Sequence, residues 1–249
     1  MRLRPIRAAV VLALATITAL PAFAQDLSRG DVETIIREYL LANPEVLEEA
    51  FTVLQQKREA EAAQERTASL VSLRQDLEAF DADPVLGNPD GTVTLVEFFD
   101  YNCGFCRQAH ADLLRLIDEN PNLRVVMKEF PVLGRGSMEA ASVSIAVNQL
   151  APEKYAEFHE RLITLEGAAN EASALELADR MGLPIDEIKS LQRAPVVRDV
   201  VEGSYEIAQA LGLSGTPSYV VGDSVEFGAV GYDRLQAAVD AAECSGATC

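Results

Sequence analysis

The segment Phe98-Phe99-Asp100-Tyr101-Asn102-Cys103-Gly104-Phe105-Cys106 decides the fold, because it sets two cysteines between a predicted strand and a predicted helix. The β-branched and aromatic run 92–99 is typical of a buried strand, and apolar residues follow at helical spacing over 103–118. Cys103 is therefore expected at a helix N-terminus, where unpaired N–H groups and the helix dipole stabilise a thiolate. Because the thiolate is the attacking species in thiol–disulfide exchange, we expect Cys103 to be the exposed nucleophile. Cys106, one helical turn further on, is positioned to attack the resulting mixed disulfide.

Two other roles are open to this cysteine pair: half of a metal site, or an inert structural bridge. A zinc site needs a second pair of ligands, and the two histidines, His110 and His159, complete no metal pattern. A bridge between residues three positions apart closes almost no loop, so it would add little stability. We therefore predict a redox-active Cys103–Cys106 pair with no metal and no other cofactor. We interpret His110 as a surface or partly buried side chain.

Residues 1–24 have the layout of a secretory signal peptide. A short basic opening with Arg2, Arg4 and Arg7 precedes an uncharged apolar run over residues 8–20. Ala22-Phe23-Ala24 then places small residues at the two positions that a signal peptidase reads. We expect export with cleavage after Ala24, and the alternative is an uncleaved N-terminal anchor.

The composition limits the kinds of partner. The formal net charge is −18, and removal of the three arginines within residues 1–24 lowers it to −21. A chain this acidic repels phosphate groups, so we expect no nucleic-acid partner and no charged membrane surface as partner. With 49% hydrophobic residues, the chain has the composition of a folded protein.

Residues 26–80 are predicted to form a helical arm. Apolar residues recur at one-face spacing from Val32 to Leu54, and Asn43-Pro44 marks a stop and an immediate restart. A second stripe, over residues 70–80, has the spacing of a coiled-coil seam or a paired helix. These helices carry too little apolar surface to fold alone, so they must lie against the main body or against another copy of the chain.

A boundary rich in proline and glycine, residues 81–91, separates the arm from the main domain. The predicted order after it is strand–helix–strand, a helical block, and then strand–strand–helix. The second strand is expected from Leu123 to Phe130, the helical block over about 137–213, and the closing helix over 232–242.

Two single residues in this pattern have chemical meaning. Glu97 is an acid inside an apolar strand, so it needs a partner or a shifted pKa unless it faces water at the strand edge. Pro217 stands at the entry to a strand in Gly215-Thr216-Pro217-Ser218-Tyr219, where a missing N–H is tolerated and a cis bond is available.

These motifs resemble the DsbA-like thioredoxin-fold family of bacterial periplasmic disulfide enzymes over about residues 82–243. The resemblance implies an α/β, thioredoxin-like fold with a helical insertion, about residues 137–213, between the second and third core strands. It implies a periplasmic location. Its expected partners are exported cysteine-containing proteins and a membrane redox partner that resets the active site.

The same resemblance implies roles for four residues. Thr216 and Pro217 would form a cis-proline loop beside the sulfurs and bind the substrate backbone as an added strand. Glu97 would accept and relay a proton for Cys106, with Lys128 on the next strand as the basic partner of Glu97.

The N-terminal part, residues 32–56, is similar to the extension of the ScsC-type branch, which is associated with copper tolerance. The resemblance implies a homo-oligomer formed through residues 26–80. Gly104-Phe105 lacks the histidine of the oxidases, and Thr216 stands before the proline where oxidases often carry valine. Both features favour an isomerase or reductase. The alternatives are a DsbA-type oxidase, a periplasmic copper-sequestering thiol protein and a holdase chaperone.

A second cysteine pair, Cys244 and Cys249, lies in the C-terminal tail, residues 244–249. We interpret it as a small structural disulfide, because neither a helix start nor a proline loop accompanies it. The alternative is an accessory redox or metal pair.

Overall fold

The structure is a computed structural model that describes residues 28–78 and 80–246. The predicted signal peptide, residues 1–24, and Cys249 lie outside the described residues. Among the residues described, no helix is both long and apolar enough to cross a membrane.

The described residues divide into two compact units, with the division between residues 56 and 57. The division therefore falls inside the predicted arm, whereas the sequence predicted it at residues 81–91. The first unit holds helix α1 (Arg29–Ala42) and the beginning of helix α2 (Glu45–Glu78). The predicted stop and restart at Asn43-Pro44 is confirmed by these bounds.

The second unit is built on a five-stranded sheet with the order β1-β3-β2-β4-β5. Its strands are β1 (Val85–Gly87), β2 (Val93–Phe99), β3 (Leu123–Glu129), β4 (Ser218–Val221) and β5 (Ser224–Phe227). β2 and β3 are parallel, and the other neighbouring pairs are antiparallel. The short edge strand β1 lies inside the stretch that the sequence predicted as a boundary loop.

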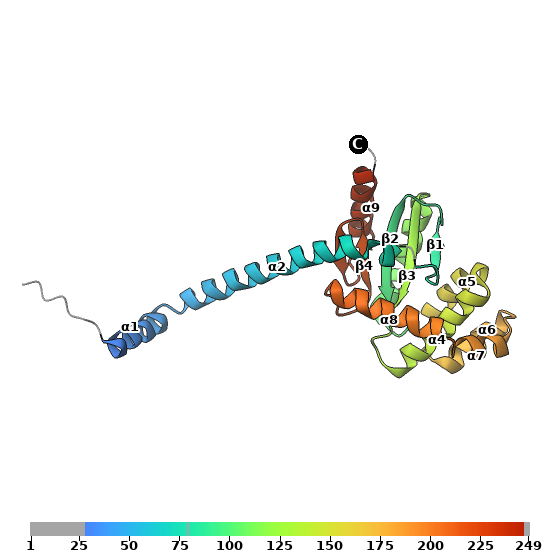
Figure 1. Cartoon of the computed structure of the whole chain (residues 1–249), viewed down its shortest axis with the longest axis horizontal. Coiled ribbons are helices and arrows are strands. Elements are labelled where there is room, and N and C mark those ends of the chain that lie inside the picture. The colour runs from blue at the N-terminus through green and yellow to red at the C-terminus, as the bar shows by residue number, and fades with distance from the viewer. Residues whose placement is uncertain (1–27, 79, 247–249) are drawn as a thin grey trace, which may run out of the picture. The chain divides into compact units, whose positions relative to one another are not determined.

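The helices of the second unit follow the predicted breaks. They are α3 (Gly104–Glu119), α4 (Arg135–Leu150), α5 (Pro152–Ile163), α6 (Glu171–Arg180), α7 (Ile185–Leu191), α8 (Pro195–Ala210) and α9 (Tyr232–Gly246). Pro152 and Pro195 each occupy the first turn of a helix, where the missing N–H has no intrahelical partner. The helices α4–α8 stand between β3 and β4 in the chain, and α4–α7 gather at one side of the sheet (Figure 1). The predicted helical insertion is confirmed.

Each face of the sheet has its own apolar core. Leu95, Phe99 and Met127 pack with residues of α3, α9 and the insertion. The opposite face, which includes Val96, Phe98 and Val126, packs with α8 and with the C-terminal half of α2. Side chains alternate between the two faces along a strand, so the position of a residue in β2 or β3 fixes the core it enters.

The two predicted stripes of residues 26–80 have different surroundings. Leu70 and Leu77 are buried in the core of the second unit, so this stripe packs on its own chain. In the first unit, by contrast, α1 has no buried residue. Large apolar side chains there stay exposed, namely Val32, Ile35, Ile36, Tyr39, Leu41, Leu47, Phe51, Val53 and Leu54.

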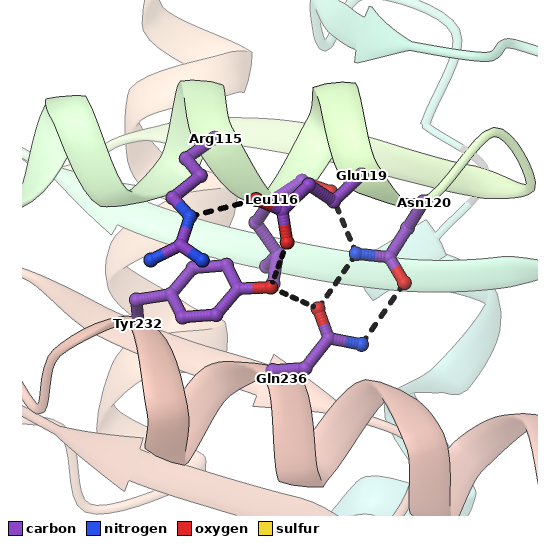
Figure 2. Close-up of polar contacts among 6 residues, drawn as sticks. All are labelled: Arg115, Leu116, Glu119, Asn120, Tyr232 and Gln236. Carbon is purple, nitrogen blue, oxygen red and sulfur yellow. Dashed lines mark hydrogen bonds and ion pairs between the residues drawn. The ribbon is translucent and has the colours of Figure 1, made fainter.

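Helix α3, which carries the cysteines, is fixed at its C-terminal end to α9 (Figure 2). Asn120 Nδ2 donates to the Leu116 carbonyl at 2.8 Å and to Gln236 Oε1 at 2.8 Å. Gln236 Nε2 donates back to Asn120 Oδ1 at 3.0 Å. The Arg115 guanidinium stacks over the Tyr232 ring, 3.7 Å from its centroid. This end of the helix is thus held by contacts that involve neither cysteine.

Candidate active site

Cys103 stands at the N-terminal end of α3, as the sequence predicts, and serves as the N-cap of the helix. Its Sγ accepts from the Cys106 backbone N–H at 3.4 Å and donates to the Thr216 carbonyl at 3.2 Å. The backbone of Cys103 is itself held, because its N–H donates to the Asp100 carbonyl at 3.0 Å. The residue is only 6% exposed, so it is more buried than we expect for an attacking thiol.

Cys106 lies one turn into α3 and is 2% exposed. Both cysteines carry free thiols. Burial is the largest cause that raises the pKa of the Cys106 thiol far above its ordinary value, and an ionised Glu97 nearby raises it further. Cys106 therefore stays protonated until some group removes its proton, which suits a second thiol that acts only after the first.

Glu97 is buried, so the alternative of a carboxylate that faces water is wrong. Burial raises its pKa to about 8. In the sheet Glu97 pairs with Tyr219 of β4, and the two residues share the face that packs on α3. The nearby Tyr219 hydroxyl lowers the pKa of Glu97, but by less than burial raises it. A carboxyl group that titrates near pH 8 beside Cys106 can exchange a proton with it.

The loop before β4 completes the surroundings of the cysteines. The Thr216–Pro217 peptide bond is cis, as the resemblance implies. The Thr216 carbonyl accepts from Cys103 Sγ, although more than a hundred residues separate the two in the chain. Thr216 is partly exposed and Pro217 is buried. The structure thus brings together Glu97, Cys103, Cys106, Thr216 and Pro217.

Lys128 does not join this group, and the prediction that it is the partner of Glu97 is wrong. The strands pair with Glu97 opposite Met127, so Lys128 stands opposite Phe98 and enters the other face of the sheet. Its Nζ forms a buried ion pair with Asp83 and donates to the Asp76 carbonyl at 2.7 Å. Asp83 belongs to the stretch that the sequence predicted as a boundary.

The two residues before Cys103 bind the helical insertion, and sequence reasoning did not single out either. Tyr101 is buried, and its hydroxyl lies 2.8 Å from Ser144 Oγ and 3.1 Å from His159 Nδ1. Asn102 binds Ser137 and Ala169 through its side-chain amide. The only available signal was their place inside the motif.

The two histidines lie next to each other, and His159 contacts the Tyr101 hydroxyl. The rings of His110 and His159 are 5.3 Å apart, and both residues are buried. Burial lowers the pKa of both, that of His159 to about 3. Glu129 of β3 is a further buried acid that the sequence analysis missed, and burial raises its pKa well above the ordinary value. An acid inside an apolar strand, the signal that identified Glu97, could have found it.

The C-terminal pair is described only in part. Cys244 is disulfide-bonded. Its predicted partner, Cys249, lies outside the described residues. Within the described part of the chain, no cluster of three or more histidine, cysteine or acidic side chains could hold a metal ion.

Comparison with known proteins places this geometry in a family. The model of the DSBA-like thioredoxin domain matches residues 94–240, which includes both cysteines and the cis-proline loop. This chain belongs to the DsbA-like thioredoxin family. A second model, the copper resistance protein ScsC N-terminal domain, matches residues 29–61, the α1 and early α2 region of this DsbA-like chain.

Several solved structures resemble the chain. A thioredoxin-like oxidoreductase from Silicibacter pomeroyi is 44% identical, with a TM-score of 0.66, and the match covers 68% of this chain and 97% of that one. ScsC from Proteus mirabilis in a transitional conformation is 29% identical, with a TM-score of 0.65, over 87% of this chain and 97% of that one.

Curated relatives match about two thirds of this chain. Disulfide bond formation protein D of Bacillus subtilis is 25% identical over 167 residues, which is 63% of this chain and 75% of that protein. A Na(+)/H(+) antiporter of Salinispora arenicola, NhaA 1, is 28% identical over 167 residues. That match covers 65% of this chain, and this chain spans only about 25% of the antiporter.

Proposed function

We propose that this chain is an exported thiol–disulfide oxidoreductase that exchanges protein disulfides through Cys103 and favours isomerisation or reduction. One observation carries the proposal: the Cys103 sulfur caps α3 between the Cys106 N–H and the Thr216 carbonyl. Helix N-termini stabilise thiolates, so the position supports Cys103 as nucleophile. The export step rests on the signal-peptide pattern of residues 1–24.

In the reducing direction, the Cys103 thiolate attacks one sulfur of a substrate disulfide. A mixed disulfide forms, and the departing substrate thiolate takes a proton from water. Cys106 then gives its proton to ionised Glu97, and its thiolate attacks the Cys103 sulfur. The second substrate thiolate leaves and is protonated, so the substrate is reduced while Cys103 and Cys106 become a disulfide. Oxidation of a substrate is the reverse of these steps.

Isomerisation needs only the first half of this sequence. While the substrate is attached to Cys103, a second substrate thiolate can attack another disulfide bond of the substrate and so change the pairing. A substrate thiolate then attacks the substrate sulfur of the mixed disulfide. The Cys103 thiolate is released when the substrate displaces it, and no net oxidation or reduction occurs. Two features support this direction: Gly104-Phe105 has no histidine between the cysteines, and threonine precedes Pro217.

The substrate backbone would bind at the cis-proline loop. Thr216 is partly exposed beside the Cys103 sulfur and precedes β4, so an extended segment bound there would sit next to the reacting atoms. Recognition through backbone groups suits many protein substrates, because it does not depend on their side chains.

The first unit supports assembly into an oligomer. Nine large apolar side chains of residues 32–54 are exposed in the single chain, and this region matches the ScsC N-terminal domain. Apolar surface of this kind marks a protein–protein contact. An oligomer formed there would present several Cys103 sites and keep a reoxidising membrane partner away, which favours isomerisation. The matched residues 29–61 contain neither cysteine, histidine nor methionine, so this segment has none of the side chains that typically bind copper.

Repair of a scrambled disulfide substrate tests the proposal. The reduced mature chain should restore activity to a protein with shuffled disulfides, and Cys103→Ser should restore none. A dithiol oxidase, supplied with its Cys103–Cys106 pair as a disulfide, would instead form disulfides rapidly in a reduced substrate while that pair is reduced, and it would leave the scrambled substrate unrepaired. Absence of both activities in the wild-type chain would exclude the proposed enzyme.

A further inference from the structure

The side-chain amide of Asn102 joins the turn before Cys103 to the helical insertion. Nδ2 donates to Ser137 Oγ at 3.0 Å and to the Ala169 carbonyl at 2.9 Å. Oδ1 accepts from the Ala169 N–H at 2.8 Å. Both amide hydrogens and the amide oxygen are therefore used, and the side chain reaches segments 35 and 67 residues away in the chain.

The residues that Asn102 binds are buried and closely packed. Ser137 and Ala169 are both buried. Gly136 lies beside them, and a Cβ there would come within 3.0 Å of the Ala169 carbonyl and 3.7 Å of Asn102 Nδ2. A side chain at position 136 would therefore press on the carbonyl that Asn102 binds.

The turn that contains Asn102 leads directly to Cys103, which carries the reacting sulfur. The Asn102 N–H donates to Asp100 Oδ1 at 2.8 Å, and the Cys103 N–H donates to the Asp100 carbonyl. These two bonds are local to the turn. Asp100 Oδ2, which accepts from the Leu133 N–H at 2.9 Å, and the Tyr101 hydroxyl attach its first half to the fold, whereas Asn102 attaches the residue next to Cys103. Cys103 follows directly, and its sulfur lies near both the Cys106 N–H and the Thr216 carbonyl. A small rotation of the turn would change both distances.

We propose that Asn102 is a positioning residue: by binding Ser137 and Ala169, it holds the turn before α3 so that the Cys103 sulfur stays at the helix N-terminus. The assignment rests on the proposed role of Cys103 as the reacting thiol. The hydrogen bonds of the Asn102 side chain go to Ser137 and Ala169, so it acts on the Cys103 sulfur through the turn. Because the helix N-terminus stabilises the reduced, thiolate-bearing form, loss of the contact disfavours that form relative to the disulfide.

The redox equilibrium of the Cys103–Cys106 pair with glutathione measures this effect. Asn102→Ala in the full mature chain should shift the equilibrium toward the disulfide by roughly three- to tenfold, the size expected for weakening one hydrogen bond. Peptide-resolved mass spectrometry separates this pair from Cys244, which is disulfide-bonded. Ser137→Ala removes one of the three bonds and should shift the equilibrium in the same direction by about twofold.

Asn120 provides a matched control at the other end of the same helix (Figure 2). It is also partly buried, donates twice through Nδ2, and accepts once at Oδ1. Asn120→Ala should therefore destabilise the fold to a similar degree and leave the glutathione equilibrium at the wild-type value. An unchanged equilibrium in Asn102→Ala overturns the proposal, and so does an equal shift in both asparagine variants. If Asn102→Ala does not fold, the shift in Ser137→Ala decides by the same criteria.

This measurement needs no protein substrate. A wild-type chain that repairs no disulfide, combined with a shifted equilibrium in Asn102→Ala, would remove the proposed function and leave the positioning role in place. A wild-type chain that repairs disulfides, combined with an unchanged glutathione equilibrium in Asn102→Ala, would remove the positioning role and leave the proposed function in place.

Discussion

Glu97 of β2 lies opposite Tyr219 of β4 on the face of the sheet that carries the cysteine helix, and its buried carboxyl has a pKa of about 8. An acid in this position is neutral in much of the physiological range. It becomes a proton acceptor only as the pH approaches its raised pKa. This relationship connects the stability of the chain to the chemistry of Cys106.

The free energy of unfolding should fall as the pH rises from about 4.5 to 8. In this window folded Glu97 keeps a proton that it loses in the unfolded chain, where its pKa is near 4.5, so the folded state is progressively disfavoured. Glu97→Gln should lower this slope by the share that Glu97 contributes, while the buried acids Asp83 and Glu129, whose pKa values burial also raises, keep the rest. The variant should be more stable than wild type above pH 8 by a few kcal/mol, since each pKa unit is worth about 1.4 kcal/mol. Denaturant unfolding of the reduced proteins measures it, with the exposed Glu153→Gln of α5 as control. An unchanged slope in Glu97→Gln would contradict the raised pKa.

The same substitution should slow the second chemical step. Cys106 must lose its proton before it attacks, and burial holds the pKa of its thiol far above the ordinary value. Loss of the proton acceptor should slow release of the substrate from the mixed disulfide by roughly 100-fold, the lower end of general base catalysis. The wild-type rate should climb toward pH 8, and the variant should lack this climb. Stopped-flow release from a preformed mixed disulfide measures both. Superimposable pH profiles from pH 5 to 9 would remove Glu97 from the mechanism.

Lys128 should affect stability and not exchange. Lys128→Met leaves the Asp83 carboxylate buried without its partner, which typically costs about 3–5 kcal/mol. The double variant Lys128→Met/Asp83→Asn removes both charges and should recover much of the loss. Exchange rates per folded molecule should match wild type in both variants. Denaturant unfolding measures the stability, and insulin reduction measures the exchange rate. A selective loss of exchange in a fully folded Lys128→Met chain would restore the role that the resemblance implied for this lysine.

Substitutions on the first unit should dissociate the proposed oligomer. Ile36 and Phe51 are 52% and 69% exposed, and a glutamate at each would place charge in an apolar contact. Ile36→Glu/Phe51→Glu should give a monomer that keeps simple exchange and loses repair of scrambled substrates. Val71→Glu is the matched control, because Val71 is 71% exposed on the part of α2 that belongs to the second unit. Light scattering gives the mass. A wild-type chain that is already monomeric would remove the main support for isomerisation.

Local patterns were sufficient to predict most elements of the fold. The strand and helix around Cys103, the breaks at Pro152 and Pro195, and β4 all follow from spacing and from proline chemistry within the chain. The edge strand β1 was missed, since its three residues form a strand only through pairing with β3. No local pattern contains that partner.

The site could be predicted only where chemistry is local. Cys103, Cys106 and the proline loop stand in distinctive motifs. The partner of Lys128, by contrast, depends on strand register: a shift of one residue between β2 and β3 moves a side chain to the other face. Asn102 escaped notice for a related reason, because its partners Ser137 and Ala169 are brought to it by the folded insertion.

The central claim is that Cys103 attacks and Cys106 resolves, and trapping of mixed disulfides tests it most directly. The mature Cys106→Ala and Cys103→Ala chains would each be mixed with the same disulfide-containing protein, and the covalent adducts would be identified by intact mass and peptide mapping. The account predicts a stable adduct on Cys103 in the Cys106→Ala chain and no adduct in the Cys103→Ala chain. Equal adducts on the remaining cysteine of both variants would contradict it.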